Sequence, residues 1–336
     1  MTIADVARRA GTSTAVVSYV VNDGPRPVSQ ATRARVKAAI DELGYRPNRL
    51  ARALVRQRSS LLGLVIPDSQ NAFFSELGLA IEQAAFERGY LVLLGNTTAS
   101  ASREAHYVRA FTDSGADGLL VASSLSGAAL ARLLPAARPF CVTLRRRPAK
   151  VHASSVVADD FEGGALATMH LLAHGYPDVA CIAGGDRLDP VAARVRGWQS
   201  ARLSAGLEKA TGVLVAGSCD RSGGYKAAER LFTEHPGASA IFAATDEQAI
   251  GVLRAAAERG RRVPCDVGVI GFDGVRESSF TVPALTTVFH PIKSLGRQAV
   301  EEALKLINGV ETEPSHVVLP VEIKLGQSCG CRVPGI

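Results

Sequence analysis

Hydrophobic residues recur at helical spacing along the first 44 residues and predict three short helices. The helices are expected at residues 2–11, 13–22 and 29–44. Thr2 and Asp5 form a capping-box pattern before the first helix, and Ser13 is the expected cap of the second. Two short helices joined by a turn at Gly11, with a third helix behind them, are typical of a helix-turn-helix domain.

From Leu61 the pattern changes to short apolar runs that alternate with longer amphipathic segments. The apolar runs predict strands at residues 61–67, 90–96, 118–123, 140–144, 178–185, 212–217, 240–246 and 266–273. The segments between them predict helices. Such an alternation forms a doubly wound parallel sheet, and the unit occurs twice along the chain. The expected fold class is therefore α/β, with two lobes and a cleft at the carboxyl ends of their strands.

The basic charge of the chain is concentrated in the predicted helical head. Residues 1–60 contain 11 Lys or Arg and 4 Asp or Glu, whereas the other 276 residues contain 27 and 28. This excess is typical of a nucleic-acid-binding surface, although a merely solubilising face would carry the same charge. No apolar run is long enough to span a membrane, and the N-terminus has no secretion-signal pattern. We therefore expect a cytoplasmic protein without a membrane partner.

Two stretches of the N-terminal region resemble the LacI/GalR family of bacterial regulators. They are TIADVARRAGTSTAVVSYVVND and VSQATRARVKAAIDELGYRPNRLARAL, and the resemblance extends over essentially the whole chain. It implies a DNA-binding head at residues 1–46, a hinge helix and linker at 47–60, and an effector-binding domain at 61–336 that resembles periplasmic sugar-binding proteins. It also implies three crossings between the lobes, with lobe one at about 61–159 and 290–318 and lobe two at about 160–288 and 319–336.

The resemblance assigns DNA contacts to the second helix of the head. The positions expected at base edges are Thr14, Ala15 and Tyr19, and those expected at phosphates are Ser13, Ser18 and Asn22. Tyr19 departs from the arginine most often found there in the family. A tyrosine cannot form the paired hydrogen bonds that an arginine forms with guanine, so the operator sequence is not implied.

The resemblance also assigns DNA contacts to the hinge. Asn48 is the expected cap of a two-turn hinge helix, Leu54 the residue that wedges into the minor groove, and Ala51 its neighbour against the second copy of the chain. Arginines surround Leu54 in the sequence, which argues against the alternative of a buried core residue. Family members pair as homodimers that read pseudo-palindromic double-stranded operators. We expect a dimer because the chain carries no C-terminal leucine heptad.

In the sensor domain, the resemblance places effector-binding residues at strand ends and helix starts. They are Phe73, Phe74, Arg194 and Asp273. Asp246, which ends a predicted strand, is a further candidate that the resemblance does not itself assign. An arginine and carboxylates beside aromatic rings suit a hydroxyl-rich or carbonyl-containing ligand, so a sugar or a nucleoside-like effector is expected. One of the two phenylalanines is equally well explained as a core residue. Cys219 stands where relatives often carry an aromatic that stacks on the ligand, which leaves the effector's identity open.

No catalytic motif is visible, so neither enzyme activity nor a cofactor is expected. The seven histidines are scattered, none pairs as a recognisable metal-ligand set, and the six cysteines match no zinc-ribbon spacing. Cys329-Gly-Cys331 is compatible with redox chemistry or metal binding, but two thiols in a tail are the simpler interpretation. No metal site is expected.

A ligand-controlled DNA-binding repressor is the function that uses the head, the hinge and the two lobes together. A secreted solute-binding protein would account only for the two-lobed domain. An enzyme of the same α/β fold would account for neither the head nor the hinge.

Overall fold

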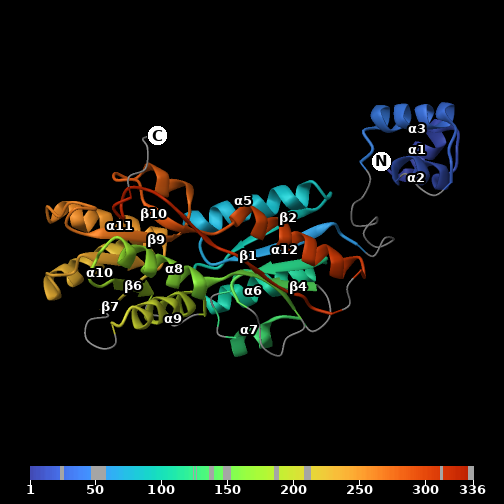
Figure 1. The fold of residues 1–336 in the computed structure, drawn as a ribbon. Coiled ribbons are helices and arrows are strands. Elements are labelled where there is room, and N and C mark those ends of the chain that lie inside the picture. The colour runs from blue at the N-terminus through green and yellow to red at the C-terminus, as the bar shows by residue number, and fades with distance from the viewer. Residues whose placement is uncertain are drawn as a thin grey trace. The chain divides into compact units, whose positions relative to one another are not determined.

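The computed structural model describes residues 1–22, 26–46, 58–123, 125, 127–135, 140–146, 153–184, 189–207, 213–310 and 313–331. The chain divides into two compact units, Met1–Ser59 and Ser60–Ile336 (Figure 1). The hinge residues Asn48, Ala51 and Leu54 lie outside the described residues, so their roles stay predictions. Within the described ranges, no helix is long and apolar enough to cross a membrane.

The first unit contains the three helices predicted from the sequence. They are α1 (Ile3–Ala10), α2 (Thr14–Asn22) and α3 (Gln30–Leu43). The expected capping box is present: Asp5 N donates to Thr2 Oγ1 at 3.3 Å, and Thr2 N donates to Asp5 Oδ2 at 2.9 Å. The three helices bury a common core of Val6, Ala7, Ala10, Val17, Val20, Val36 and Ala39. The opposite faces of the helices are left to solvent.

The second unit contains two six-stranded sheets, and we call the parts built on them lobe one and lobe two (Figure 1). The sheet of lobe one has the order β11-β5-β4-β3-β1-β2, with parallel pairing throughout. Its strands are β1 (Leu61–Ile66), β2 (Leu91–Asn96), β3 (Gly118–Val121), β4 (Phe140–Thr143), β5 (Ser154–Ala158) and β11 (His316–Leu319).

The sheet of lobe two has the order β12-β10-β9-β8-β6-β7. Its strands are β6 (Ala180–Gly184), β7 (Leu214–Gly217), β8 (Ala240–Ala243), β9 (Gly268–Asp273), β10 (Thr286–Phe289) and β12 (Glu322–Lys324). All pairings are parallel except that of β12, which runs antiparallel to β10. The predicted α/β class with two parallel-sheet lobes is confirmed. Four strands were not predicted: β5, β10, β11 and the antiparallel β12.

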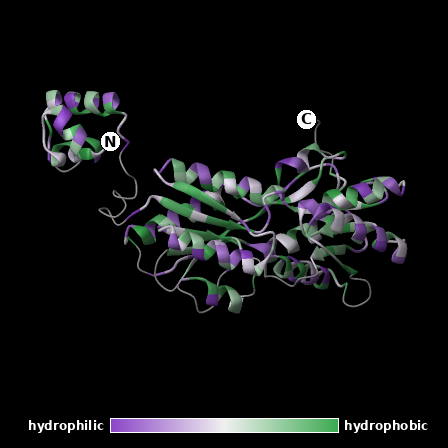
Figure 2. Ribbon diagram, turned by 180° about the vertical axis from the view of Figure 1, so that it is seen from behind, coloured by the Kyte–Doolittle hydropathy of each residue, from purple (hydrophilic) through white to green (hydrophobic). Residues whose placement is uncertain are grey.

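Helices accompany both sheets, and the apolar strands lie between them. Those of lobe one are α5 (Ala72–Phe86), α6 (Ala101–Asp113), α7 (Gly127–Leu133) and α12 (Ile292–Ile307). Those of lobe two are α8 (Asp160–Ala173), α9 (Asp189–Ser204), α10 (Arg221–Glu234) and α11 (Asp246–Glu258). Figure 2 shows mostly hydrophobic strands and helices that mix hydrophobic and hydrophilic residues. This is the distribution expected when helices bury one face against a sheet.

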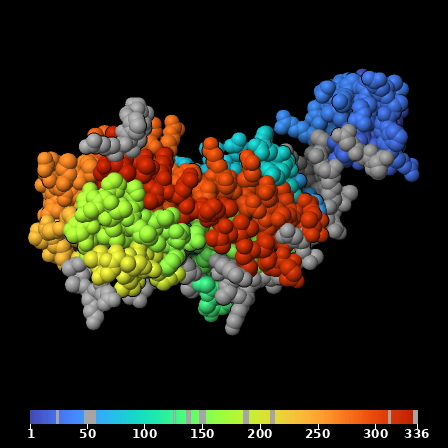
Figure 3. All heavy atoms as spheres, in the orientation of Figure 1, coloured from blue at the N-terminus to red at the C-terminus, as the bar shows by residue number. Residues whose placement is uncertain are grey.

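The chain passes between the lobes three times: from β5 to α8, from β10 to α12, and from β11 to β12. Each lobe therefore combines segments that are far apart in sequence. Figure 3 shows the C-terminal segments, coloured orange to red, at the surface of both lobes. The first crossing leads directly to Asp160 and the second passes through His290, so both residues lie at the boundary between the lobes.

Two glycines bring α8 and α9 close together. A Cβ atom at Gly164 would lie 2.0 Å from Arg194 O, and one at Gly197 would lie 2.0 Å from Phe161 O. No side chain fits at either distance, so the two helix backbones meet directly. This contact holds Arg194 on α9 beside the start of α8, where Asp160 lies.

Candidate functional site

The predicted base-reading positions of the head lie at the exposed start of α2. Ser13, Thr14 and Ala15 are exposed, and Tyr19 is half-buried one turn further along. Ser13 also acts as the expected cap, because Val16 N donates to Ser13 Oγ at 3.3 Å. Small exposed side chains at the start of a short helix suit insertion into a major groove.

The two predicted phosphate-contacting residues at the end of α2 are hydrogen-bonded to each other. Asn22 Nδ2 donates to Ser18 Oγ at 3.1 Å, and both side chains are half-buried. Across the head, Arg9 and Glu42 form an exposed ion pair of 2.7 Å between α1 and α3. The charge of Arg9 is therefore partly balanced within the head.

In lobe two, Arg194 is the centre of a buried ion network. Its Nε donates to Asp160 Oδ1 at 2.8 Å, and its Nη1 donates to Asp273 Oδ1 at 3.2 Å and to Ala244 O at 2.6 Å. The guanidinium carbon also lies 3.6 Å from the centre of the Phe272 ring. Only 5% of Arg194 is exposed. Most hydrogen-bond donors of the Arg194 guanidinium are thus already bonded to other residues of the chain.

His290 links this network to lobe one. Arg194 Nη2 lies 3.3 Å from His290 Nε2 and can only donate, so Nε2 accepts and the ring hydrogen is on Nδ1. Nδ1 is buried and has no hydrogen-bond partner among the described residues. The ring packs edge-on against Phe73 of lobe one, with ring centres 5.1 Å apart. A continuous chain of contacts therefore connects the two lobes.

The carboxylates around Arg194 have opposite pKa shifts. Burial alone would raise the pKa of Asp160, but the charge of Arg194 and the hydrogen bond from Arg194 Nε outweigh it and lower the pKa to about 2. Burial raises the pKa of Asp273 to about 6 against the Arg194 charge, and the nearby Asp246 carboxylate adds to the rise. Asp160 therefore stays ionised beside Arg194, whereas Asp273 is the carboxylate that gains a proton more easily as the pH falls.

Asp246 is oriented toward the interior of lobe two. Its Oδ1 accepts from Thr287 Oγ1 at 2.6 Å and its Oδ2 accepts from Val275 N at 2.9 Å. The residue is completely buried. These contacts fix the segment that follows β9 and give Asp246 a supporting position behind Asp273.

The two predicted aromatic residues lie at the start of α5 and belong to the core of lobe one. Phe73 and Phe74 are 7% and 8% exposed, and their rings meet edge-on with centres 5.2 Å apart. The guanidinium of Arg145, which follows β4, lies 5.6 Å from the centre of the Phe74 ring. Burial and repulsion by Arg194 lower the pKa of Arg145.

Arg145, Asp160 and His290 are site residues that the sequence analysis missed. Arg145 comes directly after a predicted strand of lobe one, and the carboxyl ends of parallel strands are where such folds bind ligands. That position was a usable signal. His290 has no comparable signal in the sequence, because its role depends on contacts with α9 and α5 that only the folded chain brings together.

A cavity of about 550 Å³ lies elsewhere in lobe two. Its lining includes Ala180, Val213 and Ala240, at the amino ends of β6, β7 and β8. The residues around Arg194 lie instead where β9 and β10 end. Because α/β sheets bind ligands beyond the carboxyl ends of their strands, we assign the functional site to the Arg194 network.

Comparisons with known proteins cover both units of the chain. A family described as "Periplasmic binding proteins and sugar binding domain of LacI family" matches residues 59–329, and "Bacterial regulatory proteins, lacI family" matches residues 2–48. The HTH-type transcriptional repressor PurR of Escherichia fergusonii is 35% identical over 318 residues, which cover 94% of this chain and 93% of the relative.

Solved structures match along nearly the full length. The Lac repressor dimer bound to operator and the anti-inducer ONPF has 26% identity and a TM-score of 0.88, covering 98% of this chain and 99% of that one. The complex of the transcriptional regulator CelR with cellobiose has 30% identity and a TM-score of 0.72, with the same coverage.

A helical DNA-binding head followed by a two-lobed α/β sensor domain defines the class of ligand-controlled DNA-binding regulators. The chain belongs to the LacI family of bacterial regulatory proteins. It is a DNA-binding transcriptional regulator with a domain for a small-molecule effector. The resemblance seen in the sequence is confirmed.

Proposed function

We propose that a sugar bound between the two lobes controls the DNA affinity of this repressor. One observation carries the proposal: charged side chains of both lobes lie near one another at the boundary between the lobes. Arg145 of lobe one is close enough to Arg194 and Asp273 of lobe two for each charge to affect the other. A ligand that contacts both groups favours one relative orientation of the lobes, and a ligand can shift an equilibrium only through such a difference in affinity.

The composition of the site favours a sugar over a flat nucleobase. Stacking needs an exposed aromatic face, but Phe73 and Phe74 are more than nine-tenths buried and Cys219 replaces a potential third ring. Carboxylate acceptors and guanidinium donors, by contrast, match the hydroxyl groups of a sugar. The cellobiose complex of the related regulator CelR supports the same class of ligand.

Arg145 suggests a further preference within the sugar class. No carboxylate within the described residues forms an ion pair with it, and the repulsion by Arg194 is larger than the attraction by either Asp160 or Asp273. A negatively charged group on the effector would relieve this repulsion and accept hydrogen bonds from the guanidinium. We therefore expect a sugar acid or a sugar phosphate to bind more tightly than its neutral parent.

We also propose the way in which the chain acts on DNA. Two copies pair, and their heads bind the half-sites of a pseudo-palindromic operator, as the Lac repressor dimer does in its operator complex. Thr14, Ala15 and Tyr19 are the proposed base-contacting residues. PurR and the Lac repressor are repressors, and we infer that this chain likewise has no enzymatic role and works in the cytoplasm, where its DNA lies.

A thermal-shift screen of the full chain tests the effector class. Neutral sugars, sugar acids, sugar phosphates and nucleosides are added separately, because a ligand that binds the native state raises the melting temperature. We expect a sugar to raise it, with a larger shift for the acidic derivative. A response to nucleosides alone would contradict the proposal.

The arginine variant Arg145→Ala then tests the site itself. Loss of its charged hydrogen bonds should cost about 1.5–3 kcal/mol of effector binding, or roughly tenfold or more in affinity, measured by calorimetry. The control is Arg132→Ala, an exposed arginine on α7 of the same lobe, which should bind the effector normally. If Arg145→Ala binds the effector as tightly as Arg132→Ala and wild type, Arg145 does not contact the effector.

A further inference from the structure

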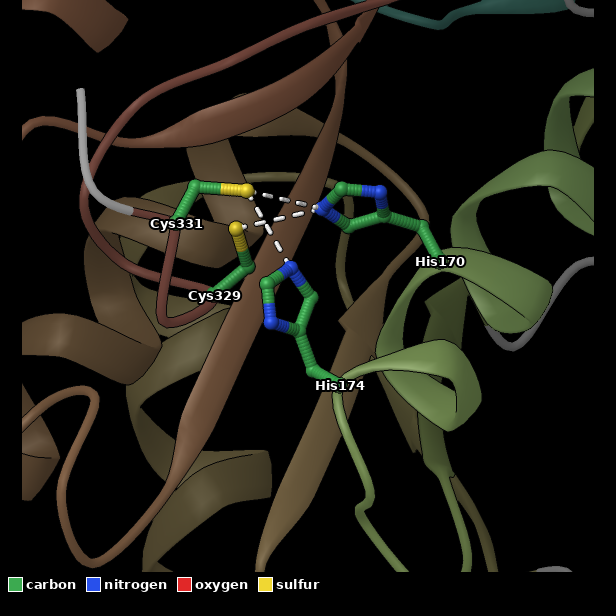
Figure 4. Close-up of side chains that lie close together, drawn as sticks. All are labelled: His170, His174, Cys329 and Cys331. Carbon is green, nitrogen blue, oxygen red and sulfur yellow. Dashed lines mark hydrogen bonds between the residues drawn. The ribbon is translucent and has the colours of Figure 1, made fainter.

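Four potential metal ligands meet at the end of α8, outside the effector site. His170 lies in the last turn of α8 and His174 ends that helix, while Cys329 and Cys331 lie near the C-terminus (Figure 4). The nitrogen and sulfur atoms that these four side chains offer all lie within 4.8 Å of one another. The two pairs are about 160 residues apart in sequence, so the fold alone brings them together.

Local structure explains why the four side chains converge. His170 and His174 are four residues apart, which places them on the same face of α8. Between the two cysteines, Gly330 has a φ of 101°, a backbone conformation that residues with a side chain rarely adopt. In Figure 4 the two thiols and the two imidazoles point toward a common centre.

The cysteine segment is anchored to the sheet of lobe two. Ser328 Oγ donates to Val269 O at 2.6 Å and accepts from Thr286 N at 2.8 Å. Thr286 Oγ1 also lies 3.0 Å from Cys329 Sγ. Cys329 is completely buried. The position of its sulfur is therefore set by the fold before any ligand binds.

The distances fit a tetrahedral zinc site. Zinc binds histidine nitrogen at about 2.0–2.1 Å and cysteine sulfur at about 2.3 Å, which puts neighbouring ligand atoms roughly 3.3–3.8 Å apart. His170 Nε2 lies 3.2 Å from Cys329 Sγ and 3.5 Å from Cys331 Sγ, and His174 Nε2 lies 3.1 Å from Cys331 Sγ. Small side-chain rotations suffice to place one ion among all four.

We propose that His170, His174, Cys329 and Cys331 bind one Zn²⁺ ion. Two thiolates and two neutral imidazoles form a common ligand set of structural zinc sites, and their two negative charges balance the ion. Four protein ligands leave no open position for a substrate, so the ion has a structural role. It joins the C-terminal segment to the end of α8 and closes one side of lobe two.

The exposure of the four residues supports a site that zinc can enter. Cys329 is buried, His170 and Cys331 are half-buried, and His174 is exposed. Ordinary core packing would explain why Cys329 is buried. It would not explain why the exposed His174 side chain points at the Cys331 thiol. The side of the site formed by His174 is therefore open to solvent, which gives the ion a path to its ligands.

Metal analysis of the full chain tests the proposal. The protein is purified with a reductant, stripped with a chelator, reloaded with Zn²⁺ and passed through a desalting column. We expect one Zn²⁺ per chain. The variants Cys331→Ser and His174→Ala remove exposed or half-buried ligands and so leave the core intact. Loss of a residue that only hydrogen-bonds to a metal ligand typically lowers metal affinity roughly 10–100-fold. Each of these variants removes a ligand itself, so its zinc affinity should fall by more than that.

Matched controls separate ligation from a general effect of losing a thiol or an imidazole. Cys265→Ser and His235→Ala change exposed residues of the same lobe that lie outside the cluster, and both should retain one Zn²⁺. Co²⁺ provides a second measurement, because a tetrahedral site with thiolates gives strong visible and near-ultraviolet absorption. These bands should appear with wild type and both controls, and disappear with the double variant Cys331→Ser/His174→Ala.

Stability gives an independent measurement. A metal that binds the folded chain raises its melting temperature, so a chelator should lower the melting temperature of wild type but not of the double variant. Equal zinc content in wild type and the double variant would overturn the proposal. A reduced wild-type protein that binds neither Zn²⁺ nor Co²⁺ would also overturn it. So would a wild-type protein in which Cys329 and Cys331 remain a disulfide with each other after treatment with a reductant.

Discussion

At the scale of single residues, Arg194 has a larger structural role than the sequence suggested. The sequence predicted an effector contact, which remains a prediction. The structure shows that its guanidinium already pairs with Asp160 and Asp273 and covers the Phe272 ring. Its main contribution is therefore to keep two buried carboxylates paired. Arg145, which has no ion pair in the described part of the chain, is the better candidate for direct recognition of a ligand.

The variant Arg194→Ala should destabilise the sensor domain as well as weaken effector binding. Removing one partner of a buried ion pair leaves an uncompensated charge and typically costs about 3–5 kcal/mol. We expect a loss of that size in the free energy of unfolding, measured with urea. The control Arg196→Ala changes an exposed residue of the same helix and should stay within about 0.5 kcal/mol of wild type. A loss below about 1 kcal/mol for Arg194→Ala would mean that the network contributes little to folding.

Asp273 combines a strained backbone with a raised pKa. Its φ of 125° lies in a region that costs a residue with a side chain about 1–3 kcal/mol. His290 N donates to Asp273 O at 3.1 Å, and Arg194 holds the side chain. Strain and an unfavourable charge at one residue are typical of functional sites.

The raised pKa of Asp273 predicts a pH effect on stability. A carboxyl group whose pKa is about 6 when folded, against about 3.8 when unfolded, binds its proton more tightly in the native state. Its contribution therefore favours folding below pH 4 and is lost as the pH rises from 4 to 6. Asp160 has the opposite shift, but its pKa of about 2 confines its effect to the range below pH 4.

The variant Asp273→Asn removes this titration, because an amide does not ionise, and it also removes the repulsion of Asp246, whose own pKa burial raises to about 6. Relative to wild type, its free energy of unfolding should improve by on the order of 2 kcal/mol between pH 4 and pH 7. Urea unfolding at several pH values measures the difference. A difference that is constant across this range would show that the interacting carboxyl groups of Asp273 and Asp246 do not titrate between pH 4 and pH 7.

At the scale of elements, the sequence predicted what depends on local pattern and missed what depends on distant contacts. The apolar run from Leu61 predicted β1 because each of its residues favours a buried strand. The capping box at Thr2 predicted the start of α1 for a similarly local reason. By contrast, β5, β10, β11 and β12 were not predicted, because strands of three to five residues are too short to show a distinctive pattern. Two of these pairings, β11 with β5 and β12 with β10, also join segments more than 30 residues apart.

In the candidate site, too, the sequence predicted positions that depend on local pattern and missed contacts between distant segments. Asp273 follows a buried strand, so its place at a carboxyl end was visible in the sequence. The pairing of Arg194 with Asp160 was not, because it depends on how closely α8 and α9 approach. The histidines at 170 and 174 appeared scattered for the same reason, since the cysteines that meet them lie on another segment.

The close contact of α8 and α9 predicts a strong effect for Gly164→Ala. The added methyl group would overlap Arg194 O and force the helices apart, which typically costs about 1–3 kcal/mol or more. It would also displace Arg194 from Asp160. Thermal or urea unfolding measures the loss. The control is Gly78→Ala in α5, where the nearest atom lies 3.9 Å away and the substitution should be neutral or stabilise by up to about 1 kcal/mol. Similar stabilities for the two variants would mean that α8 and α9 separate at little cost.

At the scale of the whole molecule, charge and fold divide the functions between the two units. Residues 1–60 carry a net charge of +7, whereas the remaining residues carry −1. The structure separates units at nearly the same position, Met1–Ser59 and Ser60–Ile336. Each unit has its own hydrophobic core. We therefore propose that DNA affinity resides in the first unit and effector affinity in the second.

This division predicts that operator affinity depends strongly on salt and effector affinity does not. Basic side chains displace counterions from phosphates, so operator affinity of the full chain should fall roughly a thousandfold or more between 50 and 200 mM salt, as measured by fluorescence anisotropy. The fragment 59–336 should remain folded, bind the effector with an affinity that changes little over that range, and show no DNA binding. Residual DNA binding by this fragment would place part of the DNA-binding surface in the sensor lobes. An operator affinity that does not change with salt would mean that the positive charge of the head lies away from the phosphates.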